Sequence, residues 1–170
     1  MGELIYPLYV GASFAEELDF ENGKFIVMDM GSVDSNGYRV EGKKTNKNRD
    51  LLQKGDLVMP KDDIGGGQII GKTAYITKEN CYVLGDHVFR IRFKELNSLF
   101  SHYYINSPHY NQKIKLCVTG SAQLGLRGLY VENSIINYPN NYDEQSNIGR
   151  LFEQIDNLIT LHQRECFFIF

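Results

Sequence analysis

The sequence contains no tryptophan, four prolines and three cysteines in 170 residues. The cysteines, Cys81, Cys117 and Cys166, are odd in number and widely separated, which excludes a disulfide framework and favours reduced thiols. No apolar run approaches the roughly 18 residues of a membrane helix, and the first residues lack the features of a secretory signal. We therefore expect a cytoplasmic protein. No cysteine or histidine pair has zinc-site spacing, so we expect no metal.

A strong charge of either sign is also missing, because the net charge is −3. The charges are nevertheless unevenly distributed. Residues 1–30 carry six acidic and one basic side chain, and residues 128–170 carry six acidic and two basic ones. Residues 31–127 carry nine acidic and fifteen basic side chains. A basic middle between acidic ends permits a local phosphate-binding face, although an ordinary mixed surface is the alternative.

A long amphipathic helix is predicted over residues 141–166. Asn141 is the expected cap, with Glu144 completing a capping box, and Gly149 costs about 1 kcal/mol relative to alanine. Apolar or semi-apolar residues recur at alternating steps of four and three, as in a coiled-coil seam. They are Ile148, Phe152, Ile155, Ile159, His162 and Cys166, with Leu151 and Leu158 widening the stripe. Such a stripe requires a partner, either another helix or the helix's own domain.

The remainder of the chain predicts an α+β fold: a bent, mixed β-sheet with a helical hairpin, followed by the one long helix. Alternating β-branched and aromatic residues between turn signals indicate strands at residues 24–30, 57–59, 68–77, 81–93 and 130–138. Helical spacing indicates a helix at residues 96–104, and Ser107 followed by Pro108 begins another.

Residues 66–73, GGQIIGKT, match the phosphate-binding pattern G-x-x-x-x-G-K-[ST]. A site of this kind needs a helix directly after the loop, so that the helix N-terminus faces the phosphates. Residues 74–77 favour a strand instead. A small nucleotide-binding enzyme using Gly66 to Thr73 is therefore kept only as the alternative function.

The run from Tyr138 to Arg164, YPNNYDEQSNIGRLFEQIDNLITLHQR, resembles the segment that closes each half of a type I restriction–modification specificity subunit. In that family a short strand ends in proline, Glu-Gln follows, and a helix of the form I-x-x-x-F-x-x-I/L-D-x-L-I-x-x-H-Q-R comes next. The matching positions are Pro139, Glu144, Gln145, Ile148, Phe152, Ile155, Asp156, Leu158, Ile159, His162, Gln163 and Arg164. Upstream, GDLVMPKDDIGGGQIIGKTAYI and TGSAQLGLRGLYV resemble the family's target recognition domain more loosely.

The resemblance implies a target recognition domain at residues 1–140 and a conserved dimerisation and spacer helix at residues 141–170, together half of a usual subunit. An engineered fragment, a truncated product and a natural half-subunit that dimerises all fit this length. The implied function is sequence-specific DNA binding without catalysis. The implied partners are double-stranded DNA and the methyltransferase subunits, with the restriction subunit as a further candidate. S-adenosylmethionine and ATP belong on those partners, and no cofactor is expected in this chain.

Candidate site residues follow from these patterns. Glycine loops let the backbone approach phosphates, lysine and arginine neutralise phosphates, and glutamine and arginine can pair with base edges. The candidate DNA contacts are Lys43, Lys44, Lys47, Arg49, Lys61, Lys72, Gln123 and Arg127. The candidate subunit interface, formed with the helix of a second copy in an antiparallel homodimer, is Ile148, Leu151, Phe152, Ile155, Leu158, Ile159 and His162. No catalytic residues are expected.

Overall fold

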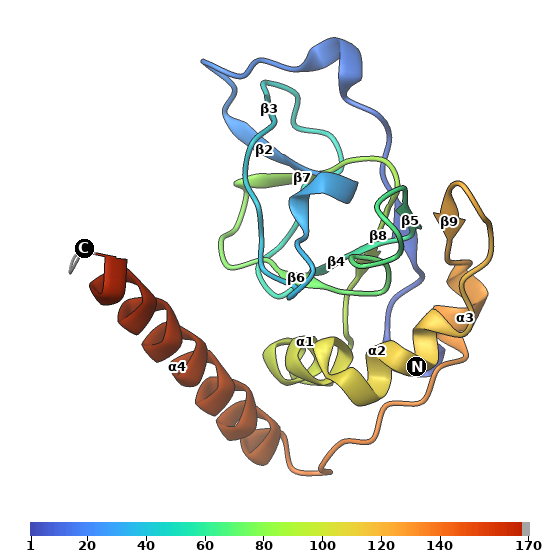
Figure 1. Ribbon diagram of the computed structural model, residues 1–170, viewed down its shortest axis with the longest axis vertical. Helices are drawn as coiled ribbons and strands as arrows, with labels where there is room; N and C mark the ends of the chain where they lie inside the picture. Colours follow the sequence, from blue (N-terminus) through green and yellow to red (C-terminus); the bar gives the residue numbers. More distant parts are fainter. Residues whose placement is uncertain (168–170) are drawn as a thin grey trace.

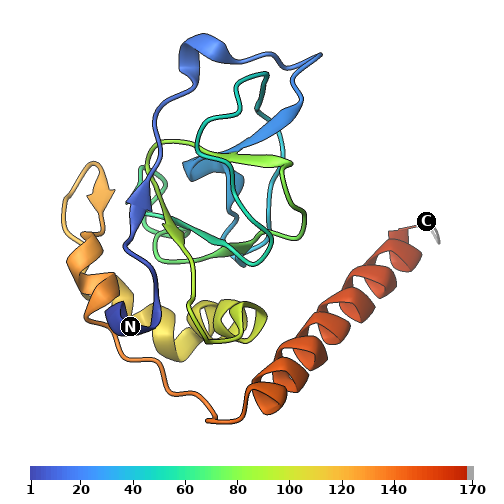
Figure 2. The same ribbon diagram turned by 180° about the vertical axis from the view of Figure 1, so that it is seen from behind.

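The chain forms a β-rich body with short helices at one end, and a long helix leans away from this body (Figure 1). The computed structural model describes residues 1–167, with the side chains of residues 1–163. The long helix, α4 (Tyr142–Phe167), begins beside the helical end of the body, and the two opposite views agree on this arrangement (Figure 2). Among the described residues, no helix is long and apolar enough to cross a membrane.

The body contains two larger sheets and a two-stranded ribbon. The first sheet is antiparallel, in the order β1 (Tyr9–Val10), β8 (Val88–Ile91), β4 (Leu57–Pro60) and β6 (Ala74–Tyr75). The second is mixed, with β2 (Phe25–Met28) antiparallel to β3 (Lys44–Thr45) and parallel to β7 (Tyr82–Leu84). The ribbon pairs β5 (Asp62–Asp63) with β9 (Leu124–Gly125). The predicted α+β class with mixed strand pairing is confirmed.

Both faces of the central strand β4 are buried, which explains why it reads as a continuous apolar run rather than an alternating one. Side chains alternate between the faces of a strand. Leu57 and Met59 therefore pack toward the helices with Ile105, whereas Val58 packs toward the second sheet with Leu84. The first sheet thus holds the helices and the second sheet together.

The helical hairpin is confirmed. It consists of α1 (Ser98–Asn106) and α2 (Pro108–Lys115). Asn97 caps α1 by accepting a hydrogen bond from the Phe100 N–H at 3.0 Å, and the Ser107 hydroxyl caps α2 ahead of Pro108 as predicted. Asn141 also caps α4, because its Oδ1 accepts the Asp143 N–H at 2.7 Å. Three short 3-10 segments, η1 (Gly2–Leu4), η2 (Ala15–Glu17) and η3 (Met30–Ser32), complete the body.

The strand predicted at residues 130–138 is wrong. Residues 130–132 belong to α3 (Gly128–Glu132), and residues 133–140 form neither helix nor strand. The carbonyls of Glu132 and Ser134 accept hydrogen bonds from the Met1 ammonium group at 3.0 and 2.5 Å, so the chain terminus takes the place of a neighbouring strand. The predicted strand at residues 81–93 divides into β7 and β8 at the turn beginning with Gly85.

A buried polar network joins the residue before β6 to α1. The Thr73 N–H donates to Asn106 Oδ1 at 2.8 Å, and the Asn106 amide nitrogen lies 3.3 Å from His102 Nδ1. The Thr73 hydroxyl lies 3.2 Å from the same ring nitrogen. An amide nitrogen can only donate, so Nδ1 accepts and the imidazole is neutral. Burial lowers the pKa of His102 from 6.5 to about 4.

This network predicts an acid sensitivity. Between pH 6.5 and about 4 the unfolded chain binds a proton at His102 that the folded protein excludes, so stability is lost as the pH falls and levels off below that window. The expected loss is about 3 kcal/mol at most. We expect His102→Gln to remove this part of the pH dependence when free energies of unfolding are measured from pH 7 to pH 4. Parallel profiles for the two proteins would contradict the assignment.

Candidate functional site

Two glycine-containing loops that lie far apart in the sequence meet at the β5–β9 ribbon. Asp62 pairs with Gly125, and the Leu126 N–H donates to the Lys61 carbonyl at 2.7 Å. Lys61 immediately precedes β5, and Arg127 follows β9 by two residues. Lys61 and Arg127 line one surface hollow of about 400 Å³, and the exposed Gln123 directly precedes β9. The structure therefore brings three of the eight predicted DNA contacts together.

The first of these loops is organised by the carboxylate of Asp63, which is 3% exposed. It accepts hydrogen bonds from the N–H groups of Gly65 at 2.5 Å and Ile69 at 3.1 Å. Gly66 and Gly67 adopt φ angles of +85° and +80°, a region that glycine enters without a steric penalty. The loop is thus a fixed turn that projects from the ribbon.

The nucleotide-binding alternative fails at the end of this loop. Strand β6, not a helix, follows Thr73. The Lys72 ammonium group donates to the Asn106 carbonyl at 2.9 Å, near the end of α1, and burial together with the nearby Lys115 lowers the pKa of Lys72. Thr73 is fully buried in the His102 network. The loop therefore has no free lysine for a phosphate, and the structure places Lys72 in a packing contact apart from the ribbon.

The other four predicted DNA contacts lie on or beside β3. Lys44 begins β3, and Lys47 is exposed just after it. Lys43 forms an ion pair with Asp29 at 2.5 Å. Arg49 has a different environment, because it pairs with Glu17, donates to the Ser13 carbonyl at 2.6 Å and covers the Phe14 ring. These contacts indicate that Arg49 fixes the segment around η2.

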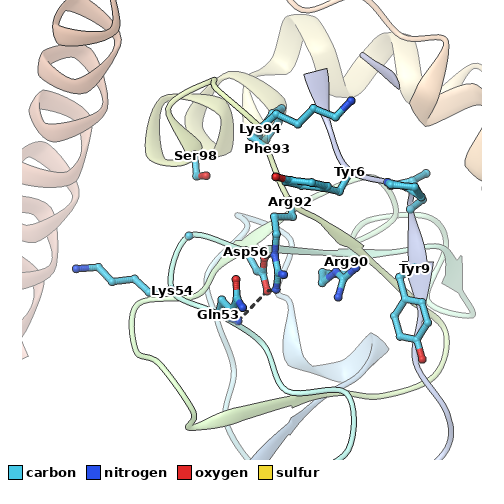
Figure 3. A pocket seen from close by; sticks show the side chains of 13 residues that line it. Tyr6, Tyr9, Gln53, Lys54, Asp56, Arg90, Arg92, Phe93, Lys94 and Ser98 are labelled. Carbon is cyan, nitrogen blue, oxygen red and sulfur yellow. Dashed lines mark hydrogen bonds and ion pairs between the residues drawn. The ribbon is translucent and has the colours of Figure 1, made fainter. Parts of the chain in front are cut away.

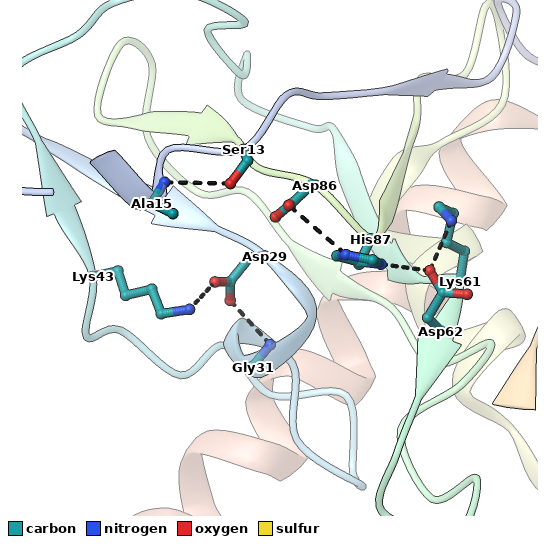
Figure 4. Close-up of polar contacts among 9 residues, drawn as sticks. All are labelled: Ser13, Ala15, Asp29, Gly31, Lys43, Lys61, Asp62, Asp86 and His87. Atoms are coloured by element: carbon teal, nitrogen blue, oxygen red, sulfur yellow. Dashed lines mark hydrogen bonds and ion pairs between the residues drawn. The ribbon is translucent and has the colours of Figure 1, made fainter. Parts of the chain in front are cut away.

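Figure 4 shows two separate groups of polar contacts, one beside β3 and one at the ribbon. The first group is the Lys43–Asp29 ion pair; next to it along the chain, the Met28 carbonyl accepts a hydrogen bond from the N–H of the buried Gly85 at 2.9 Å. In the second group, two residues further on, His87 Nδ1 lies 2.7 Å from Asp62 Oδ2, which also binds Lys61 at 2.7 Å. The two groups of predicted DNA contacts, together with the contacts that involve Asp29, Asp62 and His87, are called here the polar face.

His87 at the centre of the polar face was missed by sequence reasoning. Its φ angle is +62°, a strained value for a residue with a side chain, and such strain is often found at functional sites. Although burial opposes it, hydrogen bonds from Lys61 and His87 hold the pKa of Asp62 below its usual range. The sequence indicated only the turn at Gly85. Nothing in it signalled that Asp62, 25 residues earlier, is the histidine's partner. Among the described residues, no cluster of histidine, cysteine and acidic side chains could hold a metal.

A second functional feature is the contact between α4 and α1. Gln145, which is 3% exposed, accepts a hydrogen bond from the Asn97 N–H at 2.9 Å and donates to the Pro139 carbonyl at 2.7 Å. One turn later, a Cβ atom added to Gly149 would lie 2.9 Å from the Phe100 nitrogen. The glycine that weakens helix propensity is therefore what allows the two helices to approach so closely.

The same face of α4 continues with an aromatic and a carboxylate contact. The Phe152 ring stacks on Tyr103 with centroids 5.4 Å apart, and the Tyr103 hydroxyl donates to Asp156 Oδ2 at 2.9 Å. Burial and the bond to Asp156 raise the pKa of Tyr103 far above its ordinary value. Gln145, Gly149, Phe152 and Asp156 follow steps of four, three and four, so they share one side of the helix. This side is called the docked face.

A different side of α4 is exposed. Its residues include Leu151, Ile155, Leu158 and Ile159, with exposed fractions of 55%, 40%, 66% and 48%. At about 100° per residue this stripe is centred about 105° from the docked face. His162 is also exposed, Ile148 is half-buried, and Phe152 lies between the two sides at 45% exposure. This stripe, called the free face, contains the remaining predicted interface residues.

The close helix contact makes a testable prediction. We expect Gly149→Ala to destabilise the docked helix by about 1–3 kcal/mol, because the added methyl group meets the backbone of Phe100. The matched control is Asn147→Ala, at an exposed position of the same helix, which should be neutral or slightly stabilising. Native-state amide hydrogen exchange of residues 145–156 measures the effect. Slower exchange in Gly149→Ala than in the wild type would contradict it.

These features define an α+β domain that carries a loop-built polar face and a helix with one docked and one free side. The family model described as "Type I restriction modification DNA specificity domain" matches residues 8–166. The chain belongs to this family, which confirms the resemblance seen in residues 138–164.

Solved structures have the same fold. The S subunit of a type I restriction-modification system from M. genitalium is 18% identical, with a TM-score of 0.68, and the match covers 92% of this chain and 39% of that one. The HsdS subunit from Thermoanaerobacter tengcongensis is 18% identical, with a TM-score of 0.62, over 96% and 38% of the two chains. A structure describing complex assembly and conformational transition of the type I R-M system is 17% identical, with a TM-score of 0.67, over 96% and 39%. This protein thus spans about two fifths of these relatives, and no curated protein matches it.

Proposed function

We propose that this chain supplies a DNA recognition domain to the sequence-specificity component of a type I restriction–modification complex, without a catalytic role of its own. The observation that carries the proposal is the family match over residues 8–166. Partner methyltransferase subunits would hold S-adenosylmethionine, and a restriction subunit would use ATP. The complex would act on double-stranded DNA in the cytoplasm.

The polar face is the surface that we assign to DNA. Its cations differ in availability. Lys43 and Lys61 are paired with carboxylates, so each must exchange an aspartate for a phosphate, whereas Lys47 and Arg127 form no ion pair among the described residues. Phosphate contacts set position and register, while base contacts give specificity. Lys47 is therefore assigned to phosphate, and the loop residues Gln123 and Arg127 to base edges.

DNA binding by the polar face should depend steeply on salt, with about −0.9 in log–log slope for each neutralised phosphate. We expect Lys47→Ala to weaken binding to all sequences and to reduce the slope by about one unit. Gln123→Ala should instead broaden the preference at particular base pairs. The control, Lys78→Ala, removes an exposed charge outside the polar face and should leave both the salt dependence and the base preference of binding unchanged.

The assay is selection from a random duplex pool with methyltransferase subunits present, followed by salt titrations on the selected site. Two results would overturn the proposal: no sequence enrichment with the partners present, or equal losses in Lys47→Ala and Lys78→Ala.

We further propose that the free face of α4 pairs with the same helix of a second copy. Its side chains follow coiled-coil spacing, and full burial of an aliphatic side chain is worth roughly 1.5–3 kcal/mol. The docked face lies about 105° away around the helix, so a second helix can pack without displacing the body. An antiparallel pair would relate two recognition domains by a two-fold axis, and the DNA site would contain two identical inverted halves.

The pairing predicts an effect of charge on the free face. Ile155→Asp should shift the protein from dimer to monomer in sedimentation velocity, because it places a carboxylate in the centre of the seam. Thr160→Asp adds the same charge on the side of the helix away from the free face and should stay dimeric. A wild-type protein that remains monomeric at high concentration would contradict the pairing, as would equal behaviour of the two variants.

A further inference from the structure

A second basic surface lies across the β1–β8 pair from the hollow that contains Lys61 and Arg127. Tyr9 pairs with Arg90 and Val10 pairs with Phe89, and neighbouring side chains of a strand point to opposite faces. Val10 and Phe89 line the hollow of the polar face. Tyr9 and Arg90 line a different pocket of about 600 Å³, so this pocket is separate from the surface assigned to DNA.

The pocket has an excess of positive charge. It lies between β1, β8, the turn before β4 and the start of α1 (Figure 3). Its four cationic lining residues are Lys54, Arg90, Arg92 and Lys94, and its one acidic lining residue is Asp56. Asp56 is 1% exposed and accepts hydrogen bonds from Arg92 Nε at 2.6 Å and Nη2 at 2.7 Å. This carboxylate is therefore already neutralised by Arg92, which leaves the other three charges uncompensated in the lining.

The Arg90 guanidinium lacks a hydrogen-bond acceptor among the described residues. Its guanidinium lies 5.1 Å from the centre of the Tyr9 ring, and Figure 3 shows it between Arg92 and Tyr9. Its Nε is shielded from solvent and has no hydrogen-bond partner among the described residues. The Tyr9 hydroxyl donates to Asp50, which is the other acidic group near this wall. The terminal nitrogens of the same guanidinium also form no hydrogen bond or ion pair among the described residues, and Arg90 lines the pocket, so these nitrogens are available to an acceptor from a ligand.

Two further groups favour an anion. The nine-residue helix α1 begins at Ser98, which lines the pocket, and the N-terminus of a helix carries partial positive charge. The Ser98 hydroxyl forms no hydrogen bond within the described part of the chain. In Figure 3 the Tyr6 ring lies over Arg92 with its hydroxyl end toward Ser98, while the side chains of Lys54 and Lys94 extend outward at opposite edges of the pocket. The Lys94 ammonium group donates to the Glu3 carbonyl at 3.1 Å. The pocket thus combines donors, positive charge and an aromatic wall.

We propose that this pocket binds a phosphate group, supplied either by a free nucleotide or by a nucleic-acid backbone. A phosphate group has several acceptor oxygens and a charge of about −1 to −2. It therefore matches the forked donors of the Arg90 guanidinium and the Ser98 hydroxyl better than a single carbonyl does. The Tyr6 ring offers a surface on which a base can stack. The site does not depend on the polar face, because its residues lie on the other side of the β1–β8 pair.

The test is a titration of inorganic phosphate into the isotope-labelled full chain, at ionic strength held constant with sodium chloride and followed by NMR. Saturable shifts are expected at the amides of Tyr9, Arg90 and Ser98. Arg90→Gln should weaken binding by about tenfold or more. Lys61→Gln, a matched change on the polar face, should leave it unchanged. If Arg90→Gln does not fold, Ser98→Ala and Lys54→Gln provide milder losses in the same assay.

Shifts that do not saturate, or that persist unchanged in Arg90→Gln, would overturn the proposal. The source of the phosphate is separated by repeating the titration with adenosine monophosphate and with a short duplex of unrelated sequence. Either ligand supports the site if the response is lost in Arg90→Gln. The Lys47→Ala protein separates this proposal from the proposed DNA function. If it binds DNA more weakly but binds phosphate as the wild type does, the pocket and the polar face are distinct sites.

Discussion

The close approach of α4 to α1 is the contact on which the placement of the long helix depends. It is possible because position 149 has no side chain, and it is fixed by Gln145, whose amide bridges the start of α1 and the segment before α4. The stacked Phe152 and the carboxylate of Asp156 extend it along the helix. Since one side of α4 is held to the body in this way, the direction of the free face relative to the polar face is set by the fold.

The polar face depends on a different principle, because no regular element supplies more than a small part of it. The end of β2, the β7–β8 turn and the β5–β9 ribbon each contribute a charged group, and ion pairs link neighbouring groups. Such pairs hold lysine side chains in place before a ligand arrives, and they must be broken when phosphate replaces the carboxylate. The unpaired cations at the edge need no such exchange. In the proposed DNA-binding role, this difference would let the surface combine general attraction to DNA with selective contacts from its loops.

The sequence predicted those parts of the structure that depend on local chemistry. The Asn141 cap, the Ser107–Pro108 start and the long helix follow from neighbouring residues, and the family motif followed from the same helix. Contacts between distant residues were not predictable. From the sequence, Gly149 was expected only to weaken the helix, because its close neighbour on α1 was unknown. Lys72 was expected to be free for DNA, but its ammonium group binds a carbonyl at the end of α1. Residues 130–138 looked like a strand by composition, but the chain terminus occupies their carbonyls.

The central claim is that α4 keeps one side on its own body and offers the other to a second copy in an antiparallel arrangement. Spin–spin distances between copies test it, with one nitroxide per chain and the native cysteines replaced by serine. A label at Gln154, near the centre of the stripe, should give a short separation of about 10–20 Å. A label at Asn147 should give a separation longer by roughly 10–15 Å, because antiparallel partners move apart along the axis at twice the helix rise of about 1.5 Å per residue, and this axial offset adds to the lateral spacing. Equal separations at the two positions, or no interaction between copies, would contradict the claim.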